Sequence, residues 1–429
     1  MSGDTAFLFL GFLALLLGGV PIAVALGLSA TAVIAHAGLG IMSVPTGTYT
    51  GIAKYPLLAI PVFILAGLIF ERSGVAGRLV TLATAIVGQR GGALGIVAVL
   101  VCMVMGGISG SGPADAAAVA TVMAAGMAKA GYPRAFTASI IAAAGSTAIL
   151  IPPSIAFIVY SVLVPSASVP ALFAAGIFPG LLAGISLMVP IIVISRRYGF
   201  GRNVDGPAPR VWTSLKEASW GLLAPVIILG GMRTGAFTPT EAAVVAVFYG
   251  LAVGVFVYRS LDVRGIYRLL VEAAEISAVV MLIVGLASVF AWAGSTLGAF
   301  DQLARGMMSL GFGEWGVMVL VMVLLLFAGM FLDGVSIFLI LLPVLVPIAM
   351  AFGWDMVWFG ILLTMNIAIG QFTPPVAVNL MVTCKITGVP IEATVPWVIW
   401  LIVAMATAMG LVIVFPGIAL WLPGVLGYG

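Results

Sequence analysis

The amino-acid sequence predicts an all-α polytopic membrane protein with two inverted-topology repeats, each carrying a re-entrant helical hairpin and a transmembrane helix broken at a Pro-Pro pair. Composition is the first observation: of 429 residues, 63% are hydrophobic and 7% are charged, and the mean hydropathy is +1.30. A soluble globule of this composition could not present a solvated surface. The apolar segments are about 15 to 25 residues long and lack the alternation of outer-membrane barrels, so we expect helices that span a lipid bilayer.

A constant spacing between the two halves of the chain is the second observation. Each member of one set of glycines and prolines recurs 222 residues later: Gly107, Gly112, Gly131 and Pro152-Pro153 correspond to Gly329, Gly334, Gly353 and Pro374-Pro375. Paired Gly and Pro interruptions in corresponding halves indicate a site near the bilayer midplane of a secondary transporter. The spacing therefore predicts that the chain contains an internal duplication.

The distribution of charge is the third observation. Basic residues crowd two polar connections, which should be cytoplasmic: Arg196, Arg197, Arg202, Arg210 and Lys216 in one, and Arg259, Arg264 and Arg268 in the other. The first hairpin is flanked by Arg90, Lys129 and Arg134, whereas the second is flanked by Glu314 and Asp355. Opposite charge at equivalent positions predicts that the hairpins enter from opposite sides. Both chain termini are then expected on the external, periplasmic side.

These patterns set the expected organisation. Residues 1–200 form the first inverted repeat, with its hairpin at about 91–131 and its broken helix at about 134–165. A cytoplasmic connection covers 201–216, and the second repeat covers 217–429, with its hairpin at about 313–353 and its broken helix at about 356–384. A polar arm precedes each hairpin, and its charges are either interfacial anchors or part of an in-plane helix: Glu71, Arg72 and Arg78, then Asp301 and Arg305.

Other functional classes find little support. The formal net charge of +3 is too small, and no basic run is long enough, to suggest a nucleic-acid partner. Cys102 and Cys384 have no neighbours at metal-ligand spacing and read as packing residues. The first apolar stretch lacks a basic leader and runs past signal-peptide length, so we expect an uncleaved span. No phosphate-binding loop of the form G-x-x-x-x-G-K-[ST] occurs, and the lone His36 has no nucleophile nearby, which argues against ATP-driven pumping and enzymatic catalysis.

The interrupted backbone predicts sites for sodium ions. Free N–H and C=O groups are tolerated at membrane depth only where protein buries them or a cavity is lined, and each proline leaves a carbonyl one turn earlier available as a ligand. Carbonyls and hydroxyls suit a hard monovalent cation, and about two such sites are expected. The expected ligands are Ser109 and Ser111 with carbonyls near Gly145, Ala148 and Ile149, and then Asp333 and Thr373 with carbonyls near Phe331, Gly334 and Gly370.

A substrate anion is expected beside the ions, because helix N-termini attract negative charge. The candidate substrate-binding residues are Ser111, Gly112, Asp115, Pro152, Asn366, Gln371, Thr373 and Asn379. Three simpler roles remain open. In these alternatives the two serines only cap the following helix, Asp115 only favours the helix dipole, and the amides only bond neighbouring helices together. Since neither Arg134 nor Arg233 is expected inside the site, we expect sodium and helix termini, rather than arginine, to hold the carboxylate.

Several motifs resemble those of the large membrane subunit of tripartite ATP-independent periplasmic (TRAP) transporters. They cover most of the chain: Gly107 to Asp115 (GISGSGPAD), Lys129 to Tyr132 (KAGY), Ile151 to Ser154 (IPPS), Phe237 to Ala243 (FTPTEAA) and Phe372 to Pro375 (FTPP). The resemblance implies an elevator mechanism, in which a transport domain moves against a scaffold, driven by sodium. It also carries the family's sodium ligands onto Ser109, Ser111, Asp333 and Thr373.

The resemblance implies two protein partners and a location. One partner is a periplasmic solute-binding protein that delivers an organic acid such as a C4-dicarboxylate, sialic acid or another sugar acid. The other is a small four-helix membrane subunit, expected here as a separate chain. The location is the bacterial inner membrane. The alternative is a standalone sodium-coupled carboxylate symporter or antiporter of related architecture, which needs no binding protein.

Overall fold

The fold is helical throughout the part of the chain that the structure describes. A computed structural model describes residues 3–428 except 89, 203–208, 310 and 333, and these residues form α-helices with short 3-10 and π segments and no strand. Among them, seven helices are long and apolar enough to cross a membrane, for example Val169–Tyr198 and Val263–Thr296. This confirms the predicted class, an all-α polytopic membrane protein.

The helices follow one another in two series. The first series is α1 Gly3–Leu17, α2 Ile22–His36, α3 Ser43–Ile52, η1 Tyr55–Leu58, α4 Ala59–Arg72, α5 Val75–Val87, α6 Ala93–Ser109, α7 Gly112–Lys129, α8 Arg134–Ser146, η2 Thr147–Ile149, α9 Ile155–Leu163 and α10 Val169–Tyr198. The second is α11 Val211–Arg233, α12 Pro239–Ala252, η3 Val253–Val257, α13 Val263–Thr296, α14 Ala299–Met308, α15 Gly313–Gly329, α16 Gly334–Ala351, α17 Met356–Gly370, α18 Val378–Thr387, η4 Ile391–Thr394, α19 Val395–Val414 and α20 Gly417–Leu426.

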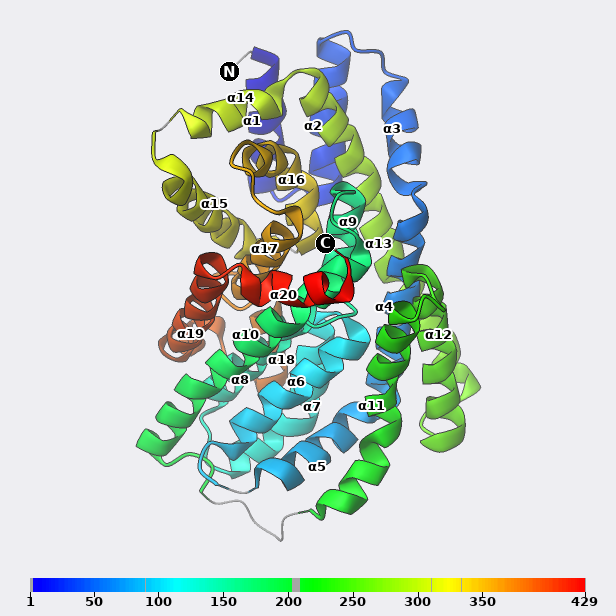
Figure 1. The fold of residues 1–429 in the computed structure, drawn as a ribbon, viewed down its shortest axis with the longest axis vertical. Helices are drawn as coiled ribbons and strands as arrows, with labels where there is room; N and C mark the ends of the chain where they lie inside the picture. Colours follow the sequence, from blue (N-terminus) through cyan, green and yellow to red (C-terminus); the bar gives the residue numbers. More distant parts are fainter. Residues whose placement is uncertain (1–2, 89, 203–208, 310, 333, 429) are drawn as a thin grey trace.

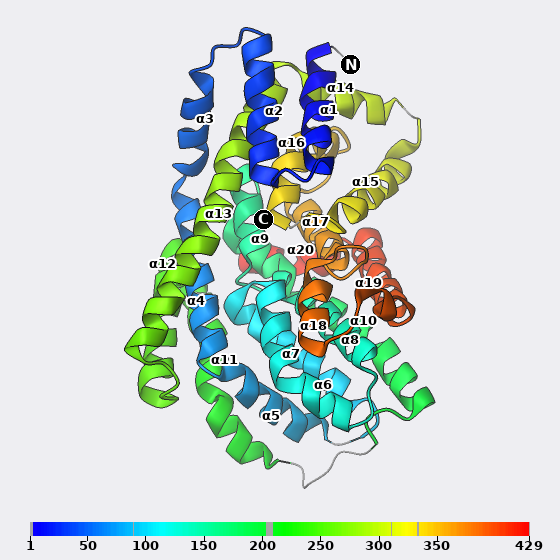
Figure 2. The same cartoon turned by 180° about the vertical axis from the view of Figure 1, so that it is seen from behind.

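Two pairs of consecutive helices form helical hairpins, at residues 93–129 and 313–351. The first consists of α6 and α7, and the second of α15 and α16. Helices α7 and α16 begin and end 222 residues apart, and α8 and α17 begin 222 residues apart, which is the offset of the sequence duplication. Figures 1 and 2 show α6 and α7 in the lower half of the molecule and α15 and α16 in the upper half. The hairpins thus approach the centre of the molecule from opposite ends.

Each hairpin is followed by a helix that breaks at its Pro-Pro pair. In the first half the helical path stops at Ile149 and resumes at Ile155, where the Ser154 hydroxyl accepts a hydrogen bond from the Phe157 N–H. In the second half α17 ends at Gly370 and α18 begins at Val378. Proline removes an N–H donor and its ring clashes with the preceding turn, so consecutive prolines interrupt the helix. We call residues 150–154 the first break and 371–377 the second break.

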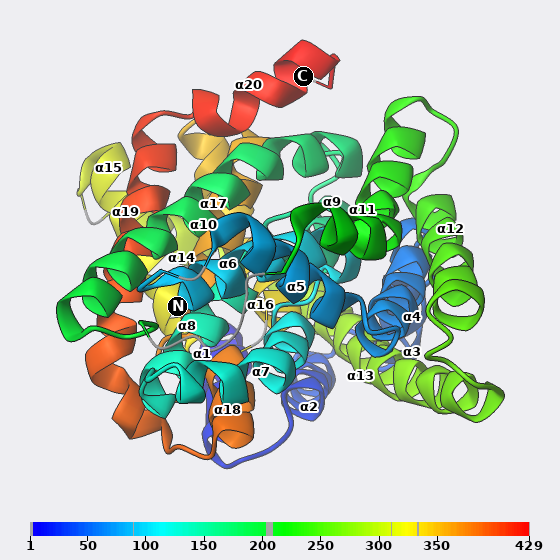
Figure 3. The same cartoon turned by 90° about the horizontal axis from the view of Figure 1, so that it is seen from below.

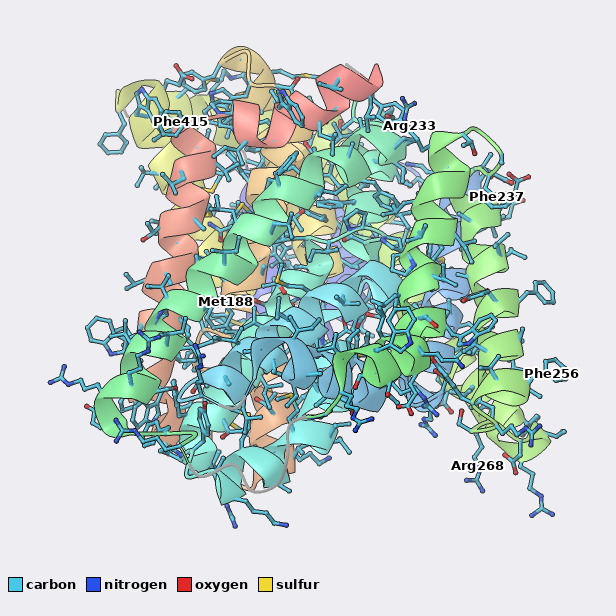
Figure 4. All side chains as sticks on the ribbon, turned by 60° about the horizontal axis from the view of Figure 1, so that its bottom comes forward. Met188, Arg233, Phe237, Phe256, Arg268 and Phe415 are labelled. Carbon is cyan, nitrogen blue, oxygen red and sulfur yellow. The ribbon has the colours of Figure 1, made fainter. Side chains whose placement is uncertain are left out.

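Helices α3, α4, α12 and α13 form a wall beside the hairpins. Helix α13 packs against α2, α3 and α4, and α4 packs against α12. Figure 3 shows α3, α4, α12 and α13 together along one side of the molecule. This wall touches both hairpins, because α4 contacts α6 and α13 contacts α16. The outer surface is apolar: Phe256 and Phe415 are 75% and 57% exposed and point away from the helices in Figure 4.

The first polar arm is divided between two helices, because Glu71 and Arg72 end α4 and Arg78 lies in α5, whereas the second arm is α14. Helix α5 lies between α11 and α6, and α14 contacts both α13 and α16. Around α5, the Arg78 guanidinium lies 3.7 Å from the centre of the Tyr258 ring, and Arg72 Nη2 lies 2.6 Å from Glu272 Oε2 on α13. In α14, Phe300 is buried whereas Asp301 is exposed. Each arm therefore connects the wall with one hairpin, and its placement in the membrane plane stays a prediction.

Candidate functional site

The tip of the first hairpin is a sharp turn between two helices. Helix α6 ends at Ser109, Gly110 follows with φ +62°, and Ser111 is the N-cap residue of α7 in extended conformation. Glycine adopts positive φ without a steric penalty, which permits this reversal. The Ser111 side chain makes no capping hydrogen bond, and the Ser109 hydroxyl accepts a hydrogen bond from the Ser111 N–H at 3.2 Å. Side-chain capping of α7 therefore does not account for Ser111.

This tip packs directly against the first broken helix. A Cβ atom added to Gly145 would lie 2.9 Å from the Gly112 carbonyl oxygen, and one added to Gly106 would lie 2.5 Å from the Ala148 Cα. A Cβ atom on Gly110 would overlap the Pro153 carbonyl oxygen. Only glycine allows backbones to approach this closely. The structure therefore brings the predicted carbonyl donors Gly145 and Ala148 to the hairpin that carries Ser109 and Ser111.

The second hairpin meets the second broken helix in the same way. Gly329 at the end of α15 lies against Gly370 at the end of α17, so that a Cβ atom on Gly370 would come within 2.6 Å of the Gly329 Cα. The Ala377 N–H donates to the Met330 carbonyl at 3.1 Å. Ala377 has φ +51°, a left-handed conformation that is costly for a residue other than glycine and typical of functional sites.

The predicted ligands of the second sodium site are only partly described. Asp333 lies outside the described residues. The Thr373 hydroxyl donates to the Ile369 carbonyl at 2.6 Å, which leaves its oxygen lone pairs as acceptors. Gly370 contacts Gly329, and Gly334 contacts the Ile367 side chain, whereas the Phe331 side chain is exposed. The backbone of the second hairpin and that of the second break are thus adjacent, as the predicted site requires.

A central cavity of about 210 Å³ joins the two halves of the molecule. Its lining comes from both hairpins, both broken helices and the wall: Ser109, Gly110, Ser111, Gly112, Pro113, Ala114, Ile149, Ile155, Ala156, Gly334, Val335 and Gln371, with Ile64, Gly67 and Leu68 of α4 and Ile276 and Val280 of α13. Concave, mostly apolar sites with a few convergent polar groups are typical of small-ligand binding. The lining residues named here include no Lys, Arg, His, Asp or Glu.

Gln371 supplies the polar group of the second half. Its side chain is 6% exposed, and its Oε1 atom has no hydrogen-bond partner among the described residues. A Cβ atom on Gly112 would lie 2.7 Å from this oxygen and 3.1 Å from Asn379 Nδ2. Asn379 itself donates from Nδ2 to the Ala142 carbonyl at 3.2 Å and does not line the cavity. The two amides thus face the first turn of α7, where backbone N–H groups are unpaired.

Five of the predicted substrate residues lie outside the cavity lining, and Asn379 is one of them. Pro152 and Thr373 belong to the breaks but not to the lining. Asn366 donates from Nδ2 to the Met322 carbonyl on α15 at 2.8 Å, which favours the simpler role of bonding neighbouring helices. Asp115 is 1% exposed and lies behind Ser109, whose hydroxyl donates to Asp115 Oδ1 at 2.7 Å. Ser111, Gly112 and Gln371 do line the cavity.

The wall residues are the part of the site that the sequence did not indicate. Ile64, Gly67 and Leu68 share one helical face by their spacing, as do Ile276 and Val280. Gly67 is the residue of this face that the sequence could have singled out, because glycine permits a close approach of two helices. In the structure a Cβ atom on Gly67 would lie 3.3 Å from the Ser109 Cα. In a membrane protein such spacing is hard to notice, because the lipid-facing side of the helix is equally apolar.

The arginines considered as carboxylate ligands lie at the periphery. Arg134 is exposed at the start of α8, and the exposed Arg233 has its guanidinium 5.8 Å from the Tyr428 ring. Figure 4 shows Arg233 at one end of the molecule and Arg268 at the other, both away from the interior. Neither Arg134 nor Arg233 lines the central cavity.

Comparison with known proteins gives the family. Residues 9–418 match the family model described as tripartite ATP-independent periplasmic transporter, DctM component. The chain is 38% identical over 439 residues to a C4-dicarboxylate TRAP transporter large permease protein of Rhodobacter capsulatus, an alignment that covers 99% of this chain and 100% of the relative. It is 36% identical to a sialic acid TRAP transporter large permease protein of Vibrio cholerae, with 98% of each chain covered.

Two further matches extend the comparison. The isethionate TRAP transporter permease protein DctMQ of Oleidesulfovibrio alaskensis is 39% identical over 421 residues, which cover 96% of this chain and 66% of the relative. Among solved structures, the YdaH transporter of Alcanivorax borkumensis shares the fold with a TM-score of 0.60 at 16% identity, covering 88% of each chain. The relatives are transporter permease components rather than enzymes, in agreement with the sequence prediction. The chain belongs to the DctM family, the large permease component of tripartite ATP-independent periplasmic transporters.

Proposed function

We propose that this permease carries out sodium-coupled symport of an organic acid that a periplasmic binding protein delivers to it. One observation carries the proposal: a single cavity is lined by both hairpins, both broken helices and the apolar wall of α4 and α13. The related permeases named above serve C4-dicarboxylate, sialic acid and isethionate transport, and all three substrates are organic anions. We infer a small organic anion as the substrate class.

The lining supports binding of an anion without an arginine clamp. The N-terminus of the 18-residue helix α7 meets the cavity at Gly112, and a helix N-terminus carries unpaired N–H donors and a partial positive charge. The Gln371 amide adds a hydrogen-bonding group from the opposite half. A cation held by Ser109 and Ser111 would add positive charge on the same side. Together these groups can balance a carboxylate or a sulfonate.

The donor types fit sodium. Hydroxyl and carbonyl oxygens are ligands that hard cations prefer, and the first hairpin tip and the first broken helix bring such groups together at Ser109, Ser111, Gly145 and Ala148. We assign the second ion to Asp333 and Thr373 with the carbonyls near Gly334 and Gly370, on the basis of the sequence. Each ion would then join a hairpin to the adjacent broken helix, so that the hairpins and broken helices move as one body.

An elevator movement is supported by the nature of the contact between this body and the wall. The wall contributes Ile64, Leu68, Ile276 and Val280, which make no directional hydrogen bonds through their side chains, and Gly67, which lets α4 approach Ser109. Such an apolar contact can slide. Helices α5 and α14, each in contact with the wall and a hairpin, are the connections that would bend during the movement.

We further propose the partners and the location that the sequence suggests. A small membrane subunit and a periplasmic binding protein complete the transporter in the bacterial inner membrane, and both chain termini of this permease lie on the periplasmic side. The fused DctMQ relative, of which this chain covers 66%, supports a membrane partner. The exposed apolar side chains of α12 and η3, such as Phe248 and Phe256, offer a surface for that subunit or for lipid.

Uptake into proteoliposomes tests the proposal. The permease and its candidate small subunit are reconstituted, and the uptake of radiolabelled organic acids is measured with and without a sodium gradient and a purified binding protein. We expect uptake only when both are present. Uptake that needs sodium but no binding protein would favour the standalone symporter, and uptake independent of the sodium gradient would overturn sodium coupling.

A further inference from the structure

A buried carboxylate lies directly behind the tip of the first hairpin. Asp115, in the first turn of α7, is 1% exposed and does not line the central cavity. Its Oδ1 atom accepts a hydrogen bond from the Ser109 hydroxyl at 2.7 Å, and its Oδ2 atom has no hydrogen-bond partner among the described residues. Asp115 therefore contacts a cavity-lining residue from the side that faces away from the cavity.

Stability of the fold does not explain this carboxylate. In the described part of the chain Asp115 takes part in no ion pair, and its carboxylate is hydrogen-bonded to the Ser109 hydroxyl rather than to the backbone of α7. Burying an unpaired carboxylate is expensive, and the attraction of a helix N-terminus returns only a fraction of that cost. An apolar residue at position 115 would serve packing better, so a functional reason for the carboxylate is needed.

The hydrogen bonds around Ser109 supply that reason. A serine hydroxyl has one hydrogen and two lone pairs. The hydrogen points to Asp115, and one lone pair accepts the Ser111 N–H at 3.2 Å. One lone pair therefore remains for a ligand, and the hydroxyl cannot turn its hydrogen toward the cavity without losing Asp115. An oxygen fixed in this way can only accept, which is what a cation requires.

We propose that Asp115 is the positioning residue of the first sodium site. It holds the Ser109 hydroxyl with a lone pair directed to the ion, and it places a negative charge behind that oxygen. This inference rests on the proposed sodium symport but goes beyond it, because Asp115 acts through Ser109 and touches neither the ion nor the substrate. Groups that orient metal ligands typically change metal affinity by roughly 10–100-fold when they are removed.

The test is a sodium titration that does not depend on transport. The purified permease is heated in mixtures of sodium chloride and choline chloride at constant ionic strength, and the sodium concentration that gives half of the thermal stabilisation is determined. We expect Asp115→Asn to raise this half-saturating concentration roughly 10–100-fold, because the amide lacks the charge and can turn its NH2 group toward Ser109. Ser109→Ala should have a similar effect.

The double variant and a control separate positioning from structure. If Asp115 acts through Ser109, adding Asp115→Asn to Ser109→Ala should raise the half-saturating concentration little further, because effects within one hydrogen-bonded unit are not additive. Ser29→Ala is the matched control, because Ser29 is also a buried serine. Its hydroxyl donates a hydrogen bond to the Leu26 carbonyl at 3.1 Å within α2, which is far along the chain from the hairpins. It should leave the half-saturating concentration unchanged.

Three outcomes would overturn the inference. One is an Asp115→Asn variant that is less stable in both salts but has the wild-type half-saturating concentration, which would make Asp115 a structural residue. Another is full additivity in the double variant, which would make Asp115 independent of Ser109. The third is a wild-type protein that sodium does not stabilise more than choline, which would remove the sodium site itself and with it the proposed symport.

A second variant covers the case in which Asp115→Asn does not fold. Asp115→Glu keeps the charge but moves the carboxylate by one methylene group relative to Ser109. Its half-saturating sodium concentration should rise above the wild-type value, although less than that of the asparagine variant. A wild-type value in the glutamate variant would also contradict the inference, because displacement of the acceptor would then have no consequence for sodium.

Discussion

The side-chain oxygen of Gln371 lies against Gly112, so closely that a Cβ atom on Gly112 would come within 2.7 Å of it. The two residues belong to different halves of the chain: Gln371 to the second break, and Gly112 to the start of the second arm of the first hairpin. Both line the central cavity. The two halves of the molecule therefore meet at the site proposed for the substrate.

Substitution of Gly112 should damage both stability and transport. In Gly112→Ala the new methyl group would meet Gln371 Oε1, Asn379 Nδ2 at 3.1 Å and the Gly145 carbonyl at 3.2 Å. Overpacking of this kind costs roughly 1–3 kcal/mol, and the displaced amide would lose its place beside the cavity. We expect a lower midpoint of thermal unfolding and strongly reduced uptake.

Gly126→Ala in the same helix is the control for this substitution. A Cβ atom there would have no heavy atom within 4 Å, and alanine stabilises a helix interior relative to glycine by roughly 1 kcal/mol. Its uptake and thermal stability should match or exceed those of the wild type. Equal uptake and equal thermal stability of the two variants would show that transport does not depend on the Gly112 contact.

Replacement of Gln371 should weaken substrate binding without lowering the stability of the fold. Gln371→Leu keeps the approximate volume and removes an unpartnered buried oxygen, so the free energy of unfolding should change little or increase. The loss of one hydrogen bond to a charged substrate should raise KM for uptake roughly tenfold or more.

Asn366→Leu should show the opposite pattern. Because Asn366 bonds the Met322 carbonyl and lies outside the cavity lining, this variant should lose roughly 1–3 kcal/mol of stability with little change in KM. Thermal unfolding and concentration-dependent uptake measure both quantities. A Gln371→Leu variant with a wild-type KM would remove Gln371 from the substrate site.

Loss of either peripheral arginine should leave transport intact. Arg134→Ala and Arg233→Ala remove exposed side chains that do not line the cavity, so the substrate anion loses no ligand. We expect sodium binding and uptake to match those of the wild type in proteoliposomes. Intact sodium binding without substrate uptake in either variant would show that arginine does hold the carboxylate.

Asp333→Ala should weaken sodium dependence and uptake together. The prediction follows from the sequence, since a carboxylate in the interrupted segment between two apolar helices is functional by default. The protein should remain monodisperse in detergent. Asp301→Ala, in the exposed part of α14, is a control that changes the same residue type outside the hairpin. Sodium-coupled uptake at the wild-type level in Asp333→Ala would exclude this residue from the second site.

The sequence predicted the interruptions of the fold better than the orientation of its helices. Glycine and proline act locally, so the turn at Gly110 and the breaks at Pro152-Pro153 and Pro374-Pro375 could be located without knowledge of the packing. The 222-residue offset then fixed the expected start of α16 relative to α7. Location of backbone irregularities is therefore accessible from a single sequence.

The rotation of each helix about its own axis could not be predicted from the sequence. Helices α4 and α13 are apolar on the faces toward protein and toward lipid alike, so nothing in their sequence marks Gly67 or Val280 as cavity-lining residues. For the same reason Asn366, Gln371 and Asn379 were equivalent candidates, whereas only Gln371 reaches the cavity. The sequence is compatible with Asp115 as a dipole partner or a substrate ligand, whereas its hydrogen bond with Ser109 follows only from the packing.

Protection of the central cavity from a thiol reagent is a direct test of whether sodium and the anion bind there together. Cys102 and Cys384 are both buried, so they are replaced by alanine, and Val280→Cys introduces a thiol into the wall of the cavity. The rate of modification is measured in detergent with a water-soluble reagent, in sodium or choline, with and without the transported anion. Thr234→Cys, in the exposed connection after α11, controls for reagent reactivity.

We expect sodium and anion together to slow the modification of Val280→Cys and to leave that of Thr234→Cys unchanged. Anion in choline should give little protection, because the ions complete the site. Equal modification rates of Val280→Cys under all four conditions, or protection by anion that does not need sodium, would exclude sodium-dependent binding of the anion in this cavity.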